Sequence, residues 1–168
     1  MFDFVSFIPR AIMQGIPLLF GSTGETLTEK SGNLNLGVPG IMYFGGIAGL
    51  TSTFMYENVY CANAGVEPNA ALCVIMCLVA SFLASALGGL IYSFLTISLR
   101  TNQNVTGLAL TTFGKGVANF FGVFILDGAS YSAAPIANKA FSAKIPVLST
   151  LGGFGQVVFS YGFLVYAA

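Results

Sequence analysis

The sequence contains no histidine and no tryptophan, and only 7% of its 168 residues are charged. Without histidine the chain lacks the usual general base and the commonest metal ligand, so histidine-dependent catalysis is excluded. A soluble domain carries about 25% charged residues, and a surface this poor in charge cannot be wetted by water. Because 55% of the residues are hydrophobic and the mean hydropathy is +0.83, the composition predicts an integral membrane protein.

Other absences narrow the chemistry. Six basic and six acidic residues cancel, so the charge balance does not point to a nucleic acid partner. Cys73 and Cys77 stand four apart and form either a redox pair, half a metal site or two packing residues. Zinc takes four ligands, and no second pair is near, so packing is favoured and neither metal nor cofactor is expected.

"FGKG" and "LGGFG" lack the spacing of a phosphate-binding loop. We therefore expect no enzyme, with any ATP hydrolysis on a partner subunit.

The apolar runs predict an all-α, polytopic transmembrane bundle. A helix needs about 20 apolar residues to cross the hydrocarbon, which gives four or five segments in one domain, residues 1–168. The first is kinked by Pro9 and Pro17, and the regular part of the second starts near Pro39. The expected spans are residues 5–24, 34–55, 69–99 and 105–126 and an element after Pro146; residues 56–68 are an expected aqueous loop and 100–104 a turn.

The run 69–99 carries no charge and exceeds one perpendicular span. It forms either a long tilted helix or one that bends at Gly88-Gly89. Small residues recur every four positions, a spacing that predicts the close approach of another helix. They are Ala80, Ala84 and Gly88 in one row and Ser81, Ser85 and Gly89 in the other.

The stretch "EKSGNLNLGVPGIM" (residues 29–42) predicts a broken helix near residues 33–40. Gly37, Pro39 and Gly40 interrupt the regular backbone, and Asn33 and Asn35 each bring two donors and an acceptor. Transporters place broken helices at their binding sites, so the amides are candidates for a solute pathway. Alternatively they cap the break, because irregular backbone at membrane depth needs protein or water to satisfy it.

Four further polar residues are candidates for the pathway. Glu25 and Glu29, with Lys30 beside them, form either a gating ion-pair cluster or a solvated loop. Lys115 lies within an apolar run, where a lysine costs ~2.5–3.5 kcal/mol at the membrane centre. It is either functional or snorkels to the interface. Asn104 belongs to the polar entry of that run.

Three stretches, in order, carry a family resemblance: "GETLTEKSGNLNLGVPGIMYFGG", "RTNQNVTGLALTTFGKGVANFF" and "KIPVLSTLGGFGQVVFSYGFLVYAA". They resemble the permeases of ATP-binding-cassette importers for nucleosides and simple sugars. Two positions depart from the family pattern: Pro39 stands where many members carry Glu, and Thr111 where Asn is usual. The matching positions are Glu25, Glu29, Lys30, Gly32, Asn35, Gly37, Gly40 and Met42, then Asn102, Gln103, Gly107, Ala109 and Leu110.

The resemblance implies a multi-pass permease subunit of a bacterial cell membrane, working by alternating access. Its partners would be a second permease subunit, ATP-binding subunits and an extracytoplasmic solute-binding lipoprotein. Family members are longer, so the chain resembles an N-terminal half, truncated at its C-terminus. The cargo stays open between a nucleoside and a simple sugar, and six cations give no clear membrane orientation. The pathway residues expected are Asn33, Asn35, Glu25, Glu29, Asn104 and Lys115.

Two other functions remain open. An ion-coupled secondary transporter would use Lys115 and Glu25 as coupling charges. A structural or remnant membrane protein would not transport at all, and its polar residues would serve the fold alone.

Overall fold

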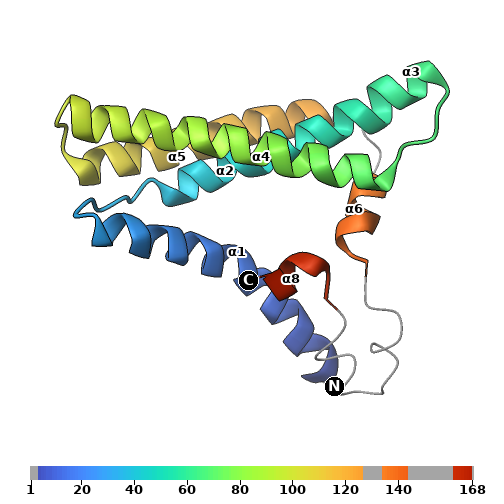
Figure 1. The fold of residues 1–168 in the computed structure, drawn as a ribbon, viewed down its shortest axis with the longest axis horizontal. Helices are drawn as coiled ribbons and strands as arrows, with labels where there is room; N and C mark the ends of the chain where they lie inside the picture. The colour runs from blue at the N-terminus through green and yellow to red at the C-terminus, as the bar shows by residue number, and fades with distance from the viewer. Residues whose placement is uncertain (1–3, 127–133, 144–160, 168) are drawn as a thin grey trace.

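The computed structural model describes residues 4–126, 134–143 and 161–167, and every regular element in these ranges is helical. Three long helices form one layer, with α2 (Val38–Phe54) between α4 (Ala70–Ser93) and α5 (Gln103–Leu126). Figure 1 shows this layer as the upper part of the molecule, with α1 (Phe4–Lys30) at an angle below it. The predicted all-α bundle is thereby confirmed.

Two helices are long and apolar enough to cross a membrane by length and composition: residues 70–98, where α4 runs on into the π-helical η2 (Phe94–Ser98), and residues 103–125 of α5. The first has no break at Gly88-Gly89. Phe82, Phe120 and Phe124 are 73%, 71% and 76% exposed, as side chains facing lipid would be. The other expected spans stay predictions, and the last falls largely outside the described residues, where only α8 (Phe163–Ala167) belongs to it.

Helix α1 extends six residues past its predicted end and contains Pro9 and Pro17. Figure 1 shows that α1 changes direction along its length, as expected for a helix whose prolines remove backbone hydrogen bonds. Its contact with the layer is close at Gly21, where an added Cβ would lie 2.9 Å from the sulfur of Met42. Elsewhere α1 packs far more lightly on α2 than α4 and α5 do.

Small residues set the spacing between α2 and α4, as the four-residue rows predicted. A Cβ added at Gly45 would overlap the Ser85 hydroxyl, and one at Gly49 would overlap that of Ser81. A Cβ at Gly88 would lie 3.0 Å from the ring of Phe44, whereas Gly89 has open space beside it. The close approach is therefore confirmed, with Gly89 outside the contact.

The predicted aqueous loop at residues 56–68 is wrong over most of its length. The π-helical η1 (Met55–Cys61) and the short α3 (Ala62–Ala64) continue α2, and the helix ends at Gly65 with φ +65°. Glu57, expected in water, is only 7% exposed. The reason is α6 (Pro135–Phe141), which packs against this end of α4 and supplies the carboxylate with partners.

Candidate functional site

The site begins where α1 stops. Gly32 has φ +85°, a conformation that glycine adopts without steric cost. Its N–H donates to the Glu29 carbonyl at 2.9 Å, and the Asn33 N–H donates to the Thr28 carbonyl at 3.1 Å. This pair of bonds is the Schellman ending of a helix. The non-helical residues 33–37 follow and connect α1 to α2; we call them the break.

Side chains from α4 and α5 satisfy the backbone of the break. The Leu34 N–H donates to Gln103 Oε1 at 2.9 Å, and the Leu34 carbonyl accepts from the Tyr92 hydroxyl at 2.6 Å. The Leu36 carbonyl accepts from the Thr111 hydroxyl at 2.8 Å. Backbone N–H and carbonyl groups that leave a helix need other hydrogen-bond partners when they are removed from water, so these contacts explain how the break is tolerated.

The two asparagines of the break have different surroundings. Asn35 is 5% exposed; its Oδ1 accepts from the Gly37 N–H at 3.0 Å, and its own N–H donates to Glu25 Oε1 at 3.0 Å. Asn33 makes longer bonds: its Nδ2 lies 3.5 Å from the Thr96 hydroxyl, and its Oδ1 lies 3.4 Å from the Tyr92 hydroxyl. The Tyr92 hydroxyl has one proton, and the shorter bond of 2.6 Å shows that this proton goes to the Leu34 carbonyl. Asn35 therefore fixes the turn with its oxygen, while its Nδ2 bonds to no described residue.

Glycines bring the start of α2 against the backbone of α5. A Cβ at Gly40 would overlap the Leu110 carbonyl, and one at Gly114 would overlap the Gly40 carbonyl. A Cβ at Gly107 would lie 2.9 Å from the Gly37 nitrogen. Because backbone cannot retreat as a flexible side chain can, this contact requires glycine and holds the break at a fixed place.

A cavity of about 330 Å³ lies between α1 and the break, and most of the surface that lines it is apolar. We call it the polar groove after the four polar residues of its lining: Ser22, Glu25, Glu29 and Asn35. Glu25 has one oxygen bonded to Asn35, while its Oε2 is buried without a hydrogen-bond partner. An unsatisfied buried polar group costs about 1–3 kcal/mol, and more when it is charged. On one wall stand Ser22, Glu25 and Glu29 of α1, and on the other Asn35, Pro39 and Met42.

The polar groove gathers three of the six predicted pathway residues: Glu25, Glu29 and Asn35. It runs on between α1 and α2 into an apolar cavity of about 430 Å³, because Leu18, Pro39 and Met42 line both. Asn33 instead faces Tyr92 and Thr96. Asn104 and Lys115 are exposed on α5 and line neither cavity.

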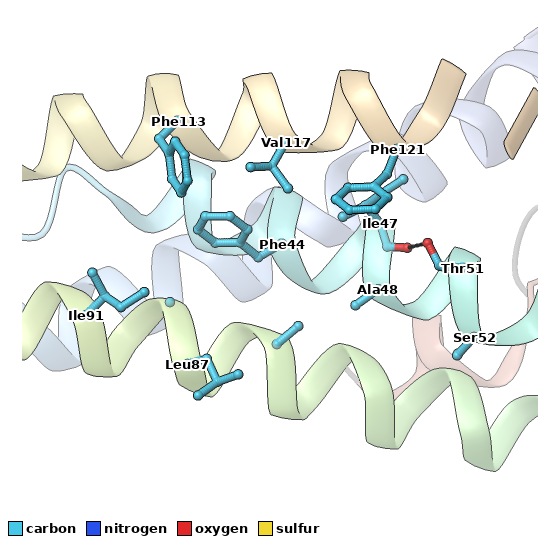
Figure 2. Close-up of a pocket in the computed structure, with 12 residues that line it drawn as sticks. Phe44, Ile47, Ala48, Thr51, Ser52, Leu87, Ile91, Phe113, Val117 and Phe121 are labelled. Atoms are coloured by element: carbon cyan, nitrogen blue, oxygen red, sulfur yellow. Dashed lines mark hydrogen bonds between the residues drawn. The ribbon is translucent and has the colours of Figure 1, made fainter. Parts of the chain in front are cut away.

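A separate cavity of about 510 Å³ lies between α2, α4 and α5. Figure 2 shows Phe44 and Phe113 facing each other across it, with ring centroids 5.8 Å apart. Its Thr51 hydroxyl donates to the Ile47 carbonyl at 2.7 Å, the dashed line in Figure 2. Its lining contains no charged side chain, whereas that of the polar groove includes Glu25 and Glu29, so it is the poorer candidate for binding a hydrophilic solute.

A second carboxylate lies where η1 meets α6. Glu57 Oε2 accepts from the Ile136 N–H at 3.1 Å, and Oε1 accepts from the Ala137 N–H at 2.8 Å and faces the Cys73 sulfur at 3.6 Å. The first N–H groups of a helix lack partners within it, so Glu57 caps α6. Cys73 is 0% exposed and packs with Ala137, a contact that agrees with the packing interpretation of the cysteines.

Comparison with known proteins identifies the family. A sequence profile described as "Branched-chain amino acid transport system / permease component" matches residues 7–166. The chain belongs to this permease family.

Two curated relatives support the family assignment. A candidate glucose ABC transporter permease protein, TsgC13 of Haloferax volcanii, is 36% identical over 106 residues, which cover 62% of this chain and 27% of the relative. Guanosine ABC transporter permease protein NupQ of Bacillus subtilis is 28% identical over 153 residues, covering 91% of this chain and 44% of the relative. The permease chain thus spans less than half the length of either relative. No solved structure matches it.

The motif residues of this permease chain build the break. Gly32 ends α1, Asn35 forms the turn, and Gly37 and Gly40 meet α5. Gln103, from the second motif stretch, accepts the Leu34 N–H. The first two of the stretches that carry the family resemblance therefore meet in one structural unit, although they lie far apart in the sequence.

Sequence reasoning missed three residues. Tyr92 and Thr96 lie within the uncharged run 69–99 and were not among the predicted site residues. Their hydroxyl groups are the signal in the sequence, because a hydroxyl in an apolar span needs a polar partner nearby. Glu57 was assigned to a loop, and no signal in its own neighbourhood indicated α6, which follows 78 residues later. Thr111, a departure from the usual Asn, still donates to the break.

Proposed function

We propose that this chain is part of the permease subunit of an ATP-driven importer that carries a nucleoside or a simple sugar across a bacterial cell membrane. The family assignment and the names of the two relatives support the class. The observation that carries the proposal for this chain is the polar groove, in which Glu25, Glu29 and Asn35 meet beside a non-helical break.

The proposed mechanism is alternating access without covalent chemistry in this chain. α2, α4 and α5 form a layer locked by glycine and serine contacts, whereas α1, the other wall of the groove, packs lightly. Relative movement of α1 and the layer would open or close the groove. The work would come from ATP-binding subunits, with a second permease subunit completing the pathway and an extracytoplasmic solute-binding lipoprotein delivering the cargo.

The test is uptake of labelled guanosine and glucose by cells that carry or lack the gene for this chain. We expect deletion to abolish uptake of one of them, and uptake to stop with vanadate, which arrests ATP-binding-cassette ATPases. It should persist when a protonophore collapses the ion gradient. Uptake that stops with the protonophore and resists vanadate would favour the ion-coupled transporter. Unchanged uptake of both solutes after deletion would favour a structural or remnant protein.

A further inference from the structure

We propose that Glu25 and Asn35 recognise one hydroxyl of a neutral sugar ring. Glu25 Oε2 accepts a hydrogen bond from this hydroxyl, and the Asn35 Nδ2 donates one to its oxygen. A free monosaccharide and the ribose of a nucleoside share this chemistry. The inference rests on the proposed function and assigns a ligand group to the polar groove.

The two side chains are held together before any ligand arrives. Glu25 Oε1 accepts the Asn35 N–H at 3.0 Å, and the Asn35 Oδ1 is bound to the Gly37 N–H at 3.0 Å. These bonds leave two side-chain atoms available to a ligand. They are Oε2 of Glu25, which is buried without a partner, and Nδ2 of Asn35, which bonds to no described residue. Asn35 is 5% exposed and lines the groove, so its free amide belongs to a built site.

Glu25 and Asn35, which are joined by the bond from the Asn35 N–H to Glu25 Oε1, thus offer one acceptor and one donor. That pair suits a hydroxyl, which donates one hydrogen bond and accepts another at its oxygen. An anionic group suits the groove poorly, because it would face the carboxylates of both Glu25 and Glu29. Hard cations take six or more oxygen ligands, and the described residues contain no group of three His, Cys, Asp or Glu able to hold a metal. The groove therefore favours neutral, hydroxylated cargo over its phosphorylated forms.

In this conformation the Oε2 atom is covered, so a ligand reaches it when the wall formed by α1 shifts. α1 packs more lightly on α2 than α4 and α5 do, whereas the layer behind the break is held by close backbone contact at Gly40 and Gly114. A shift of α1 against the layer therefore disturbs fewer contacts between the described helices. Binding of the hydroxyl would then satisfy an atom that the closed groove leaves without a partner. Cargo recognition and the movement of α1 are thereby linked.

The experiment measures ATP-dependent uptake by the complete importer in proteoliposomes. Guanosine is compared with its 2′-, 3′- and 5′-monodeoxy analogues, and glucose with a panel of monodeoxyglucoses. A hydrogen bond to a charged group is worth about 1.5–3 kcal/mol, so loss of the recognised hydroxyl should weaken apparent affinity on the order of tenfold or more. Glu25→Gln should weaken affinity for the hydroxylated solute similarly, yet leave the deoxy analogue unchanged, because the contact is already absent.

Glu67→Gln is the matched control, since it makes the same change at an exposed carboxylate that does not line the groove and should keep the full discrimination. Asn35→Asp is the second variant: it preserves the acceptor for the Gly37 N–H, replaces Nδ2 by an oxygen, and should lose the discrimination as Glu25→Gln does. The solute pair that shows this coupling identifies the source of the hydroxyl, nucleoside or free sugar.

Two results would overturn the inference in distinguishable ways. If Glu25→Gln and Asn35→Asp reduce uptake of the hydroxylated and deoxy solutes by the same factor, the pair is structural only, and the proposed function stands. If the wild-type importer takes up no nucleoside and no simple sugar, the proposed function fails and the hydroxyl site fails with it.

Discussion

Glu25 and Glu57 are two carboxylates in nearly the same situation, with one difference. Each accepts backbone N–H groups from a segment that it holds against the bundle. Glu57 uses both oxygens, on Ile136 and Ala137, and has a thiol beside it. Glu25 uses one oxygen on Asn35 and leaves the other buried without a partner.

The difference separates a carboxylate that only holds a helix in place, which we call a clamp (Glu57), from one that is able to bind a ligand (Glu25). A carboxylate whose two oxygens both accept from the first N–H groups of a helix stabilises that helix and already has a partner on each oxygen. A half-satisfied carboxylate costs free energy in the closed state, and a suitable donor would recover it. Substitutions at the two regions should therefore give opposite patterns, large losses of stability at the clamp and small ones at the groove.

The largest effect on stability is expected from Glu57→Gln. The amide keeps one acceptor but turns an NH₂ group toward the second N–H of α6, leaving a buried donor unpaired and removing the charge at the helix start. Together these cost about 3 kcal/mol. Hydrogen exchange of the Ile136 and Ala137 amides measures it directly and should accelerate. Unchanged exchange at these amides would show that Glu57 is not what holds α6.

Gly40→Ala should cost less, about 2 kcal/mol, because its Cβ would overlap the Leu110 carbonyl and push α2 from α5. Gly46→Ala is the control on the same helix, since nothing lies within 4 Å of its Cβ. Alanine there should stabilise α2 by about 0.5–1 kcal/mol. Thermal unfolding in lipid nanodiscs reports both. Equal effects of the two variants would contradict the backbone contact between α2 and α5.

Asn35→Ala should cost about 1 kcal/mol by leaving the Gly37 N–H without its acceptor. Asn33→Ala should cost less, because the bonds of Asn33 are 3.4–3.5 Å long. In uptake assays at matched abundance, both variants should reduce transport, Asn35→Ala more strongly. Equal losses of transport, with falling abundance, would instead indicate that both substitutions disturb folding.

The smallest effect on stability belongs to Glu25→Gln, at about 0–0.5 kcal/mol. The amide oxygen keeps the Asn35 N–H, and the change removes a carboxylate oxygen that had no partner in the closed groove. The unfolding temperatures of the Glu25→Gln and Glu57→Gln variants should be measured side by side, because the two substitutions are chemically identical. A loss at Glu25 as large as that at Glu57 would mean that Glu25 is a clamp as well.

Local patterns were enough to predict much of this fold. Pro39 and the glycines around it located the start of α2, and the four-residue row of Ser81 and Ser85 predicted the face that meets α2. Both signals act through neighbours in sequence, because they concern helix periodicity and backbone conformation. The alternation of Asn and Leu left two roles open for the amides, a solute pathway or capping of the break. In the structure the Asn35 Oδ1 accepts from the Gly37 N–H, whereas the Asn33 side chain contacts Tyr92 and Thr96.

Contacts between distant segments were beyond the same reasoning. Nothing near Glu57 reveals that α6 returns to it, and nothing near Glu25 shows that one of its oxygens stays free. Asn104 and Lys115 qualified by residue type, yet they are exposed away from the groove. Polarity in an apolar run marks candidate residues, but only the packing decides which of them meet.

The anchoring of the break also has a consequence for biogenesis. The partner of the Leu34 N–H is 69 residues further along the chain, and that of the Leu36 carbonyl is 75 residues further. At a synthesis rate of about 5–20 residues per second, the ribosome needs roughly 4–15 s to supply them. During that interval the Leu34 N–H and the Leu36 carbonyl lack the partners that they have in the finished fold. Water or the insertion machinery must therefore bond to them until α5 has been made.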